Sequence, residues 1–326
     1  MTAALRLGLV GCGRLAEQGY VPAAARSAAV QIVAVADPDP TRRGAVAALV
    51  GGGASAHADA ASLLDDADSV DALVLATPAA HHLADAERAV VRGLHVLVEK
   101  PPAPDALGAH ALAALGDRVR VGFNRRFDAA AIDVRRRLPA SGPLDLALTL
   151  TYRRASWSAH TVRDDVVLDL VPHLVDWARW LSGSDVLSVA TEELAPDRAV
   201  LGLRLGRGRA TVTAAADRLH EERIVVRGAG GAVLAEHRAG GPLGAVTGRA
   251  QSVLVRLRGV DAPHPLAESL AAQLDAFAAA VRSGDPGELA TAADGVAAMA
   301  AVDAARTSAA AGGAAVPVHD LREPTC

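Results

Sequence analysis

Three observations predict an α/β protein of two domains, the first a doubly wound parallel sheet and the second an α/β domain with a large, mainly antiparallel open sheet. The chain has 326 residues, which is more than one ordinary domain needs. Its first part alternates continuous apolar runs with helical segments, as a parallel sheet covered on both faces does. Its later part contains strands that alternate apolar and polar residues, which is typical of an antiparallel sheet with one covered face. We place the domains at residues 1–123 and 124–326.

The first domain contains short apolar runs separated by helical patterns. Strands are expected at Leu5–Val10, Gln31–Ala36, Ala72–Ala76, Val96–Val98 and Val119–Phe123, the last of this sheet. Helices are expected from Arg14 to about Ser27, over Thr41–Val50 and from about His82 to Arg92.

The second domain shows period-two alternation, which is clearest in Leu144–Tyr152. Further strands are expected at Val186–Leu194, Ala199–Leu205, Ala210–Ala215, Arg223–Arg227 and Val233–His237. Helices are expected from about Val166 to Leu181, from Leu266 to Arg282 and from Thr291 to about Ala310. Leu270, Leu274 and Phe277 form one apolar stripe on the second of these helices.

Composition excludes several classes of function. The net charge is −4 with no basic cluster, which gives no support for nucleic-acid binding. No apolar run approaches the roughly 18 residues that span a bilayer. The N-terminal residues do not resemble a secretory signal, so we expect a cytoplasmic protein without membrane contact. The two cysteines, Cys12 and Cys326, show no metal or disulfide spacing, and no metal site is expected.

A glycine-rich turn follows the first predicted strand and opens a helix. In the pattern Gly11-x-Gly13-x-x-Ala16, Gly11 makes the tight turn, Gly13 lets a pyrophosphate approach the backbone, and Ala16 permits close helix–strand packing. Arg14 and Leu15 begin the helix, whose N-terminal N–H groups favour an anion. The turn therefore predicts a dinucleotide-binding domain of the Rossmann type.

The second predicted strand is followed by Asp37. A carboxylate at this position accepts hydrogen bonds from the adenosine ribose and repels a 2′-phosphate, which favours NAD. Arg42 and Arg43 favour NADP instead, because either guanidinium can neutralise the 2′-phosphate. We expect NAD as the preferred cofactor and leave NADP open.

Lys100 is the only lysine among the 33 Lys and Arg residues. A chain that uses Arg elsewhere but retains one Lys indicates a position that needs a titratable amine, which Arg does not provide. Chance retention of a surface Lys is the alternative. Lys100 follows the strand Val96–Val98, and Thr77-Pro78 follows another strand at the same edge. Ligands of doubly wound sheets bind beyond the carboxyl ends of the strands, so we expect Lys100 to face the nicotinamide.

Asp169 and His173 form a possible acid–base pair within DLVPHLVDWARWL. On one helix, side chains four residues apart share a face. A carboxylate beside an imidazole raises its pKa and makes it an acid–base catalyst near neutral pH. Pro172 indicates that the regular helix begins near this position, in which case the pair lies in a turn. Such a pair by itself is more often structural than catalytic.

Together these motifs resemble the Gfo/Idh/MocA family of glucose–fructose oxidoreductase, inositol dehydrogenase and rhizopine catabolism proteins. The resemblance runs through nearly the whole chain, in GLVGCGRLA, VAVADPDPTR, LATPAAHHLADAERAVVRGLHVLVEKP, VGFNRRF, DLVPHLVDWARWLSG and AESLAAQLDAFAAAVRSGDP. The EKP segment combined with the later D-x-x-x-H is specific to it.

The resemblance implies a Rossmann domain followed by an α/β domain whose open sheet joins the subunits of a homodimer or homotetramer. It implies catalytic positions for Lys100, Asp169 and His173. The residues that we assign to the cofactor are Gly11, Gly13, Arg14, Leu15, Asp37, Arg42, Thr77, Pro78, His82, Glu99 and Lys100. Those that we assign to the substrate are Asn124, Arg126, Tyr152, Trp157, Arg163, Asp169 and His173.

The chain departs from the family around the proposed catalytic aspartate. The family often has glycines before that residue and one two residues after it. Here Asp164-Asp165-Val166-Val167 and Val171 stand in those places. We expect the bulkier residues to reshape the substrate pocket.

The expected reaction is the NAD(P)-dependent interconversion of a secondary alcohol and a ketone on a sugar, cyclitol or sugar nucleotide. His173 is expected to remove the hydroxyl proton, Asp169 to orient the imidazole, and Lys100 to stabilise the developing alkoxide. Three alternatives stay open. They are an NAD-dependent glycoside-cleaving enzyme without net redox change, a non-catalytic dinucleotide-binding regulator, and an imine or enone reductase.

Overall fold

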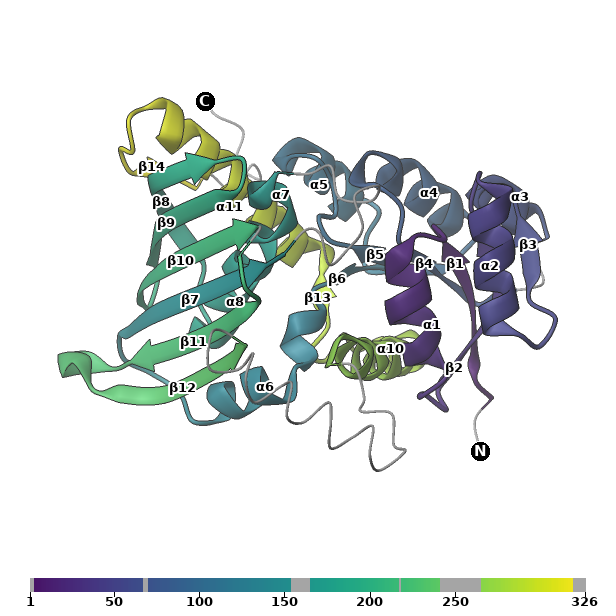
Figure 1. Ribbon diagram of the computed structural model, residues 1–326, viewed down its shortest axis with the longest axis horizontal. Coiled ribbons are helices and arrows are strands. Elements are labelled where there is room, and N and C mark those ends of the chain that lie inside the picture. Colours follow the sequence, from purple (N-terminus) through teal and green to yellow (C-terminus); the bar gives the residue numbers. More distant parts are fainter. Residues whose placement is uncertain (1–2, 67–69, 154–164, 217, 241–264, 319–326) are drawn as a thin grey trace. The chain divides into compact units, whose positions relative to one another are not determined.

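A computed structural model describes residues 3–66, 70–153, 165–216, 218–240 and 265–318 (Figure 1). Contacts divide the chain into two compact units. Unit 1 comprises Met1–Phe127 and Pro265–Val296, and unit 2 comprises Asp128–His264 and Ala297–Cys326. Each unit contains a seven-stranded sheet, one mainly parallel and one mainly antiparallel. The predicted fold class is confirmed.

The sheet of unit 1 has the order β13-β6-β5-β4-β1-β2-β3. Its parallel strands are β1 (Leu5–Val10), β2 (Val30–Ala36), β3 (Ser55–His57), β4 (Ala72–Leu75), β5 (His95–Glu99) and β6 (Val119–Gly122). The strand order reverses between β1 and β4, which is the switch point where doubly wound sheets bind ligands.

Two short strands of this sheet, β3 and β13, were not expected from the sequence. The short strand β13 (Ala290–Thr291) pairs antiparallel with β6, so the prediction that Val119–Phe123 forms the last strand of the sheet is wrong. A strand of two residues carries no periodicity that a sequence pattern can reveal.

Helices cover both faces of this sheet. On one face a π-helical turn (Ala16–Tyr20), α1 (Val21–Ala24), α2 (Pro40–Val50) and α10 (Pro265–Ser283) contribute to the core, and on the other α3 (Ala60–Asp65), α4 (Ala79–Val91) and α5 (Ala106–Ala113) do. Alternate residues of one strand serve the two cores: Val74 packs with the first set, and Leu73 and Leu75 pack with the second. This double burial explains why the strands are apolar throughout.

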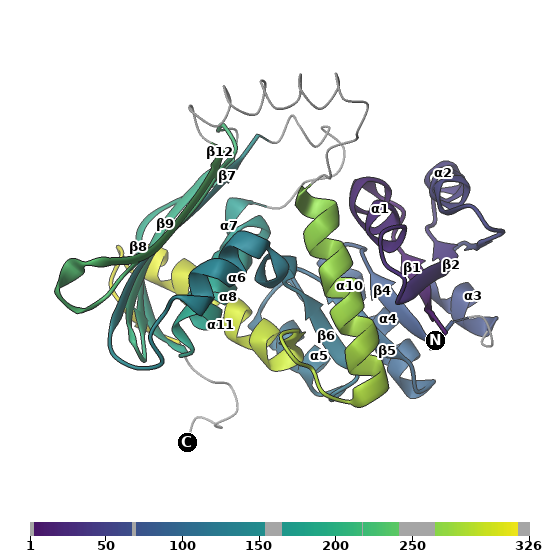
Figure 2. The same cartoon turned by 90° about the horizontal axis from the view of Figure 1, so that it is seen from below.

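The sheet of unit 2 has the order β12-β11-β7-β10-β9-β8-β14. Its strands are β7 (Leu144–Tyr152), β8 (Val186–Ala195), β9 (Arg198–Leu205), β10 (Gly208–Ala216), β11 (Glu221–Arg227), β12 (Val233–Gly240) and β14 (Val316–Pro317). Among these strands, β7 and β10 pair in parallel and the other pairs are antiparallel. Helices α6 (Ala129–Arg136), α8 (Val171–Ser182) and α11 (Ala292–Ala310) lie along one face of this sheet (Figure 2).

The helix predicted from about Val166 to Leu181 is two helices. Helix α7 (Val166–Asp169) has Leu170 as its C-cap, and α8 begins at Val171. Pro172 explains the break, because its ring has no N–H to donate and clashes with the carbonyl four residues earlier. The pair Asp169 and His173 therefore spans a junction between helices. None of the helices within the described ranges is long and apolar enough to cross a membrane.

Candidate cofactor and active site

The turn after β1 has the geometry that its glycines predict. Gly11 has φ +97°, and a Cβ added there would lie 2.6 Å from the carbonyl oxygen of Ala76, at the end of the neighbouring β4. A Cβ added to Gly13 would meet nothing within 4 Å. Ala16 is fully buried at the start of the π-helical turn. Gly11 is thus required by the fold, whereas the space above Gly13 is open to a ligand.

The two residues after this turn begin the helix. The side chain of Arg14 donates to Gln18 at 3.0 Å, and Leu15 packs against the apolar core. Neither observation assigns them a ligand. Both residues lie at the helix N-terminus, where backbone N–H groups favour an anion. It is therefore their backbone, and not their side chains, that fits a role in cofactor binding.

Asp37 is buried and ties the glycine-rich turn to the end of β2. Its carboxylate accepts hydrogen bonds from the backbone N–H groups of Cys12 and Asp39, both at 2.8 Å. The guanidinium of Arg42 donates to the same carboxylate at 2.9 Å, and that of Arg43 donates to the Asp37 carbonyl at 2.6 Å. An ionised carboxylate has about four acceptor positions, so three bonds leave one for a ribose hydroxyl.

Cys12 is a small buried residue of the glycine-rich turn. Its thiol is fully buried and lies 3.6 Å from the carbonyl oxygen of Ala36. Burial, followed by the negative charge of Asp37, raises the pKa of the Cys12 thiol to about 12. The thiol is therefore protonated and unreactive near neutral pH.

Thr77 and His82 lie at the carboxyl end of β4. The Thr77 hydroxyl is buried, and no described residue hydrogen-bonds to it. One ring nitrogen of His82 lies 2.7 Å from the carbonyl oxygen of Thr77 and the other lies 3.2 Å from that of Pro102. Pro78 is the N-cap of α4. Burial lowers the pKa of His82, so the neutral ring is favoured and donates to one of these carbonyls.

Glu99 ends β5 and forms a buried pair with Tyr20. The Tyr20 hydroxyl donates to one oxygen of the Glu99 carboxylate at 2.6 Å, and the backbone N–H of Lys100 donates to the other at 3.0 Å. Burial raises the pKa of Glu99, and burial together with the Glu99 charge raises that of Tyr20 well above its usual value. Lys100 is half-buried, and its peptide bond to Pro101 is cis.

No sequence pattern identifies Tyr20. The residue lies in the helix after the glycine-rich turn, far along the chain from Glu99, and no motif links the two. Its contact with Glu99 makes it a positioning residue for the segment that carries Lys100.

Two observations in unit 1 fit a dinucleotide. The open space above Gly13 leaves room for a pyrophosphate, and the buried Thr77 hydroxyl offers a polar group near the switch point. Gly11, Asp37, Thr77 and Lys100 all follow parallel strands at the carboxyl edge of one sheet. This is the edge at which doubly wound sheets bind nucleotides.

In unit 2, Asp169 and Tyr152 are in contact. The Tyr152 hydroxyl donates to the Asp169 carboxylate at 2.5 Å. His173 is buried on the first turn of α8. Asp176, which sequence analysis did not select, is also buried and lies three residues further along α8, where it shares a face with His173.

Of the four remaining predicted substrate residues, the structure describes two. Asn124 donates to the Ser269 hydroxyl at 3.0 Å, and the Arg126 guanidinium lies 3.3 Å from the Asp294 carboxylate. Both side chains are thus engaged within unit 1. Trp157 and Arg163 lie outside the described residues. Val166, Val167 and Val171, which stand where the family often has glycine, are buried in unit 2.

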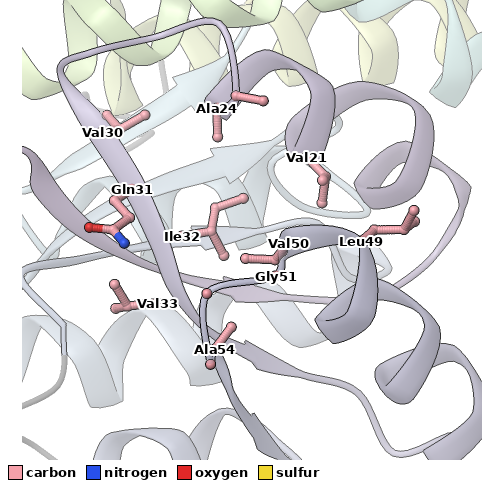
Figure 3. Close-up of a pocket in the computed structure, with 13 residues that line it drawn as sticks. Val21, Ala24, Val30, Gln31, Ile32, Val33, Leu49, Val50, Gly51 and Ala54 are labelled. Carbon is pink, nitrogen blue, oxygen red and sulfur yellow. The ribbon is translucent and has the colours of Figure 1, made fainter.

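A pocket of about 400 Å³ opens elsewhere on unit 1 (Figure 3). Residues of α1, the first half of β2, the end of α2 and the segment after it line the pocket, and Gln31 is the only polar side chain among them. The pocket borders the start of β2, whereas Asp37 follows the end of that strand. It is therefore not part of the candidate cofactor site.

Fold and site together define a dinucleotide-binding Rossmann unit joined to an α/β unit. Residues 5–123 match the model of the Gfo/Idh/MocA oxidoreductase family, which has an NAD-binding Rossmann fold. Over these residues the resemblance to that family seen in the sequence is confirmed.

Curated relatives match part of the chain. Inositol 2-dehydrogenase 4 of Saccharopolyspora erythraea is 36% identical over 193 residues, which are 57% of this chain and 56% of that protein. Rhizopine catabolism protein MocA of Rhizobium meliloti is 34% identical over 188 residues, or 55% and 58% of the two chains. The chain thus spans little more than half the length of these relatives.

A solved structure matches over almost the full length. Scyllo-inositol dehydrogenase from Lactobacillus casei, with bound NAD(H) and scyllo-inositol, has a TM-score of 0.76 and 18% identity, and covers 97% of this chain and 99% of its own. At that identity the comparison shows a shared fold.

Proposed function

We propose that the chain is an NAD-dependent dehydrogenase that interconverts a secondary alcohol and a ketone on a cyclitol or related sugar. The observation that carries the proposal is the carboxyl edge of the unit 1 sheet, where the glycine-rich turn, Asp37 and Lys100 each follow a parallel strand. The names of the relatives, which are inositol dehydrogenases and a rhizopine catabolism protein, support a cyclitol substrate.

Unit 1 supplies the groups that would hold the cofactor. The backbone around Gly13 and the helix N-terminus would bind the pyrophosphate, Asp37 the ribose, and Thr77 the nicotinamide side. When bound, NAD accepts a hydride from the substrate carbon. NADP is the alternative cofactor, because the guanidinium of Arg42 already lies beside Asp37 in an ion pair.

The chain's own residues would move the proton and stabilise charge. His173 would remove the hydroxyl proton as a general base, a step worth about 10²–10⁴-fold. Asp169, held by the Tyr152 hydroxyl, would orient that imidazole. Lys100 would hydrogen-bond the substrate oxygen and stabilise it as it becomes an alkoxide.

We expect Lys100→Arg to abolish most turnover while NAD binding persists. Arg keeps the positive charge but cannot release a proton and has a different shape. The measurements are nicotinamide absorbance with cyclitols, sugars and sugar nucleotides in both directions, and NAD titration of the same protein. Arg118→Lys, on an exposed surface of unit 1, is a control for conservative exchange. Wild-type rates in Lys100→Arg refute the assigned role.

The absorbance screen also separates the alternatives. A released sugar or aglycone without net absorbance change indicates the glycoside-cleaving reaction. NAD binding without turnover of any substrate indicates a regulator, and turnover of C=N or C=C substrates alone indicates the imine or enone reductase. We further propose that the open sheet of unit 2 joins the subunits of a homodimer or homotetramer.

A further inference from the structure

Three side chains from separate parts of unit 2 converge on one spot. The ligand atoms of Asp128, Glu222 and His237 all lie within 4.8 Å of one another. Asp128 precedes α6, Glu222 lies on β11, and His237 lies on the edge strand β12. Glu222 is buried and the other two are half-buried. Because the three residues are far apart in the sequence, no spacing motif reveals them.

Strand pairing puts Glu222 and His237 on the same face of the sheet. Glu222 on β11 pairs with Ala239 on β12, and Ile224 on β11 pairs with His237 on β12. Glu222 and His237 are therefore diagonal neighbours across the two strands. Ile224 on this face is fully buried. Helix α6 packs against β12 and brings Asp128 to the same place.

Four other charged residues on these two strands lie on the opposite face and are paired with one another. Arg223 lies 3.5 Å from Glu236, and Arg238 lies 3.0 Å from Glu221. All four alternate along the strands with Glu222 and His237, and successive strand residues point to opposite faces.

The backbone holds Asp128 in place as the cap of α6. One oxygen of its carboxylate, Oδ1, accepts the N–H groups of Ala130 at 2.9 Å and Ala131 at 3.1 Å. Both bonds use the same oxygen, so a ligand can coordinate Oδ2 without disturbing the cap. The carboxylate is therefore pre-oriented.

We propose that Asp128, Glu222 and His237 bind a divalent transition-metal ion, with Zn²⁺ as the best fit. Two carboxylates this close repel each other, and a cation bound between them relieves that repulsion. One imidazole with two carboxylates suits Zn²⁺, whereas Mg²⁺ and Ca²⁺ prefer oxygen ligands alone. Bonds of about 2.1 Å in a tetrahedral site separate the ligand atoms by about 3.4 Å, a contraction that side-chain rotation can provide.

The bound ion joins the β11–β12 hairpin to the start of α6. A metal that binds the folded state but not the unfolded chain stabilises the protein in proportion to the logarithm of its concentration. The site uses none of the residues assigned to the dehydrogenase reaction.

The test is Zn²⁺ binding to the full-length, untagged chain. The protein carries Cys326→Ser to remove a competing thiol, and is freed of metal with a chelator. Calorimetric titration with ZnCl₂ at near-neutral pH gives the affinity, and elemental analysis after gel filtration gives the stoichiometry. The variants are His237→Asn, Glu222→Gln and, as a matched control, His220→Asn, which removes an exposed histidine close to the same hairpin.

We expect one Zn²⁺ per chain and a loss of affinity of at least about tenfold in His237→Asn and Glu222→Gln, because even outer partners of metal ligands are worth about 10–100-fold. His220→Asn should bind as the parent does, and MgCl₂ should not compete. The proposal is overturned if the parent binds no Zn²⁺, if His237→Asn binds it unchanged, or if His220→Asn loses it equally. Far-ultraviolet circular dichroism checks folding, and Asp128→Asn, which keeps a capping oxygen, replaces any variant that does not fold.

Discussion

At the scale of single residues, the buried imidazole of His82 connects two loops of the candidate cofactor site. Its ring nitrogens face the carbonyl oxygens of Thr77, after β4, and of Pro102, after β5. Since burial lowers the pKa of His82 below its usual 6.5, the folded protein holds this proton less tightly than the unfolded chain. Protonation therefore favours unfolding, and the stability that His82 contributes is present above pH 6.5 and lost as the pH falls.

We predict that His82→Gln reduces the acid sensitivity of the fold. Between about pH 7 and about pH 5 the wild type should lose up to about 2 kcal/mol of unfolding free energy through this residue, and the variant should not. Urea unfolding at both pH values measures the difference. The control is His81→Gln, which changes the exposed neighbour. Equal pH dependence in His82→Gln and wild type contradicts the assignment.

At the scale of elements, the turn between β1 and the following helix uses its two glycines for different purposes. Gly11 lies against the backbone of the strand next to β1, with a φ that L side chains rarely adopt. Gly13 faces open space. The first glycine therefore serves the packing of the sheet, and the second leaves room for the ligand.

Gly11→Ala and Gly13→Ala should separate folding from cofactor binding. We expect Gly11→Ala to lower the unfolding free energy by at least about 2 kcal/mol, through backbone strain and a clash with Ala76. Gly13→Ala should change it by less than about 0.5 kcal/mol while weakening NAD binding, because the methyl group occupies the space for the pyrophosphate. Urea unfolding and NAD titration of both variants measure this. A Gly13→Ala protein that binds NAD as the wild type does argues against a pyrophosphate at this turn.

At the scale of the whole molecule, unit 1 is built from two separate stretches of the chain. Helix α10 lies far along the sequence from the Rossmann strands, but Leu270, Leu274 and Phe277 are at most 1% exposed in the core of that unit. Strand β13 extends the same sheet. The nucleotide-binding unit is therefore incomplete without residues 265–296.

We predict that a fragment of residues 1–123 does not fold stably. Loss of the three α10 side chains removes about 1.5–3 kcal/mol of burial each, comparable with the whole stability of an ordinary domain, about 5–15 kcal/mol. A matched fragment that joins residues 1–127 to 265–296 through a flexible linker should unfold cooperatively and bind NAD. Circular dichroism during urea unfolding compares the two. Cooperative unfolding of the shorter fragment with similar stability refutes the prediction.

Local sequence patterns determined the longer strands and most of the longer helices, with the motifs that they carry. Continuous apolar runs such as Leu5–Val10 predict buried parallel strands, and period-two alternation in Leu144–Tyr152 predicts a half-covered sheet, because side-chain periodicity follows directly from backbone geometry. Local patterns also predict the positions of Gly11 and Lys100. Gly11 lies in a turn that needs a positive φ, and Lys100 follows an apolar strand and so lies at its carboxyl end.

Only the tertiary structure decided which distant side chains meet. The contact of Tyr20 with Glu99, the bridge that His82 makes between two loops, and the convergence of Asp128 with Glu222 and His237 join residues that no local pattern connects. The short strand β13 is of the same kind, since its partner β6 lies far away in the sequence. Such contacts depend on how complete elements pack, because packing brings side chains within bonding distance regardless of their separation along the chain.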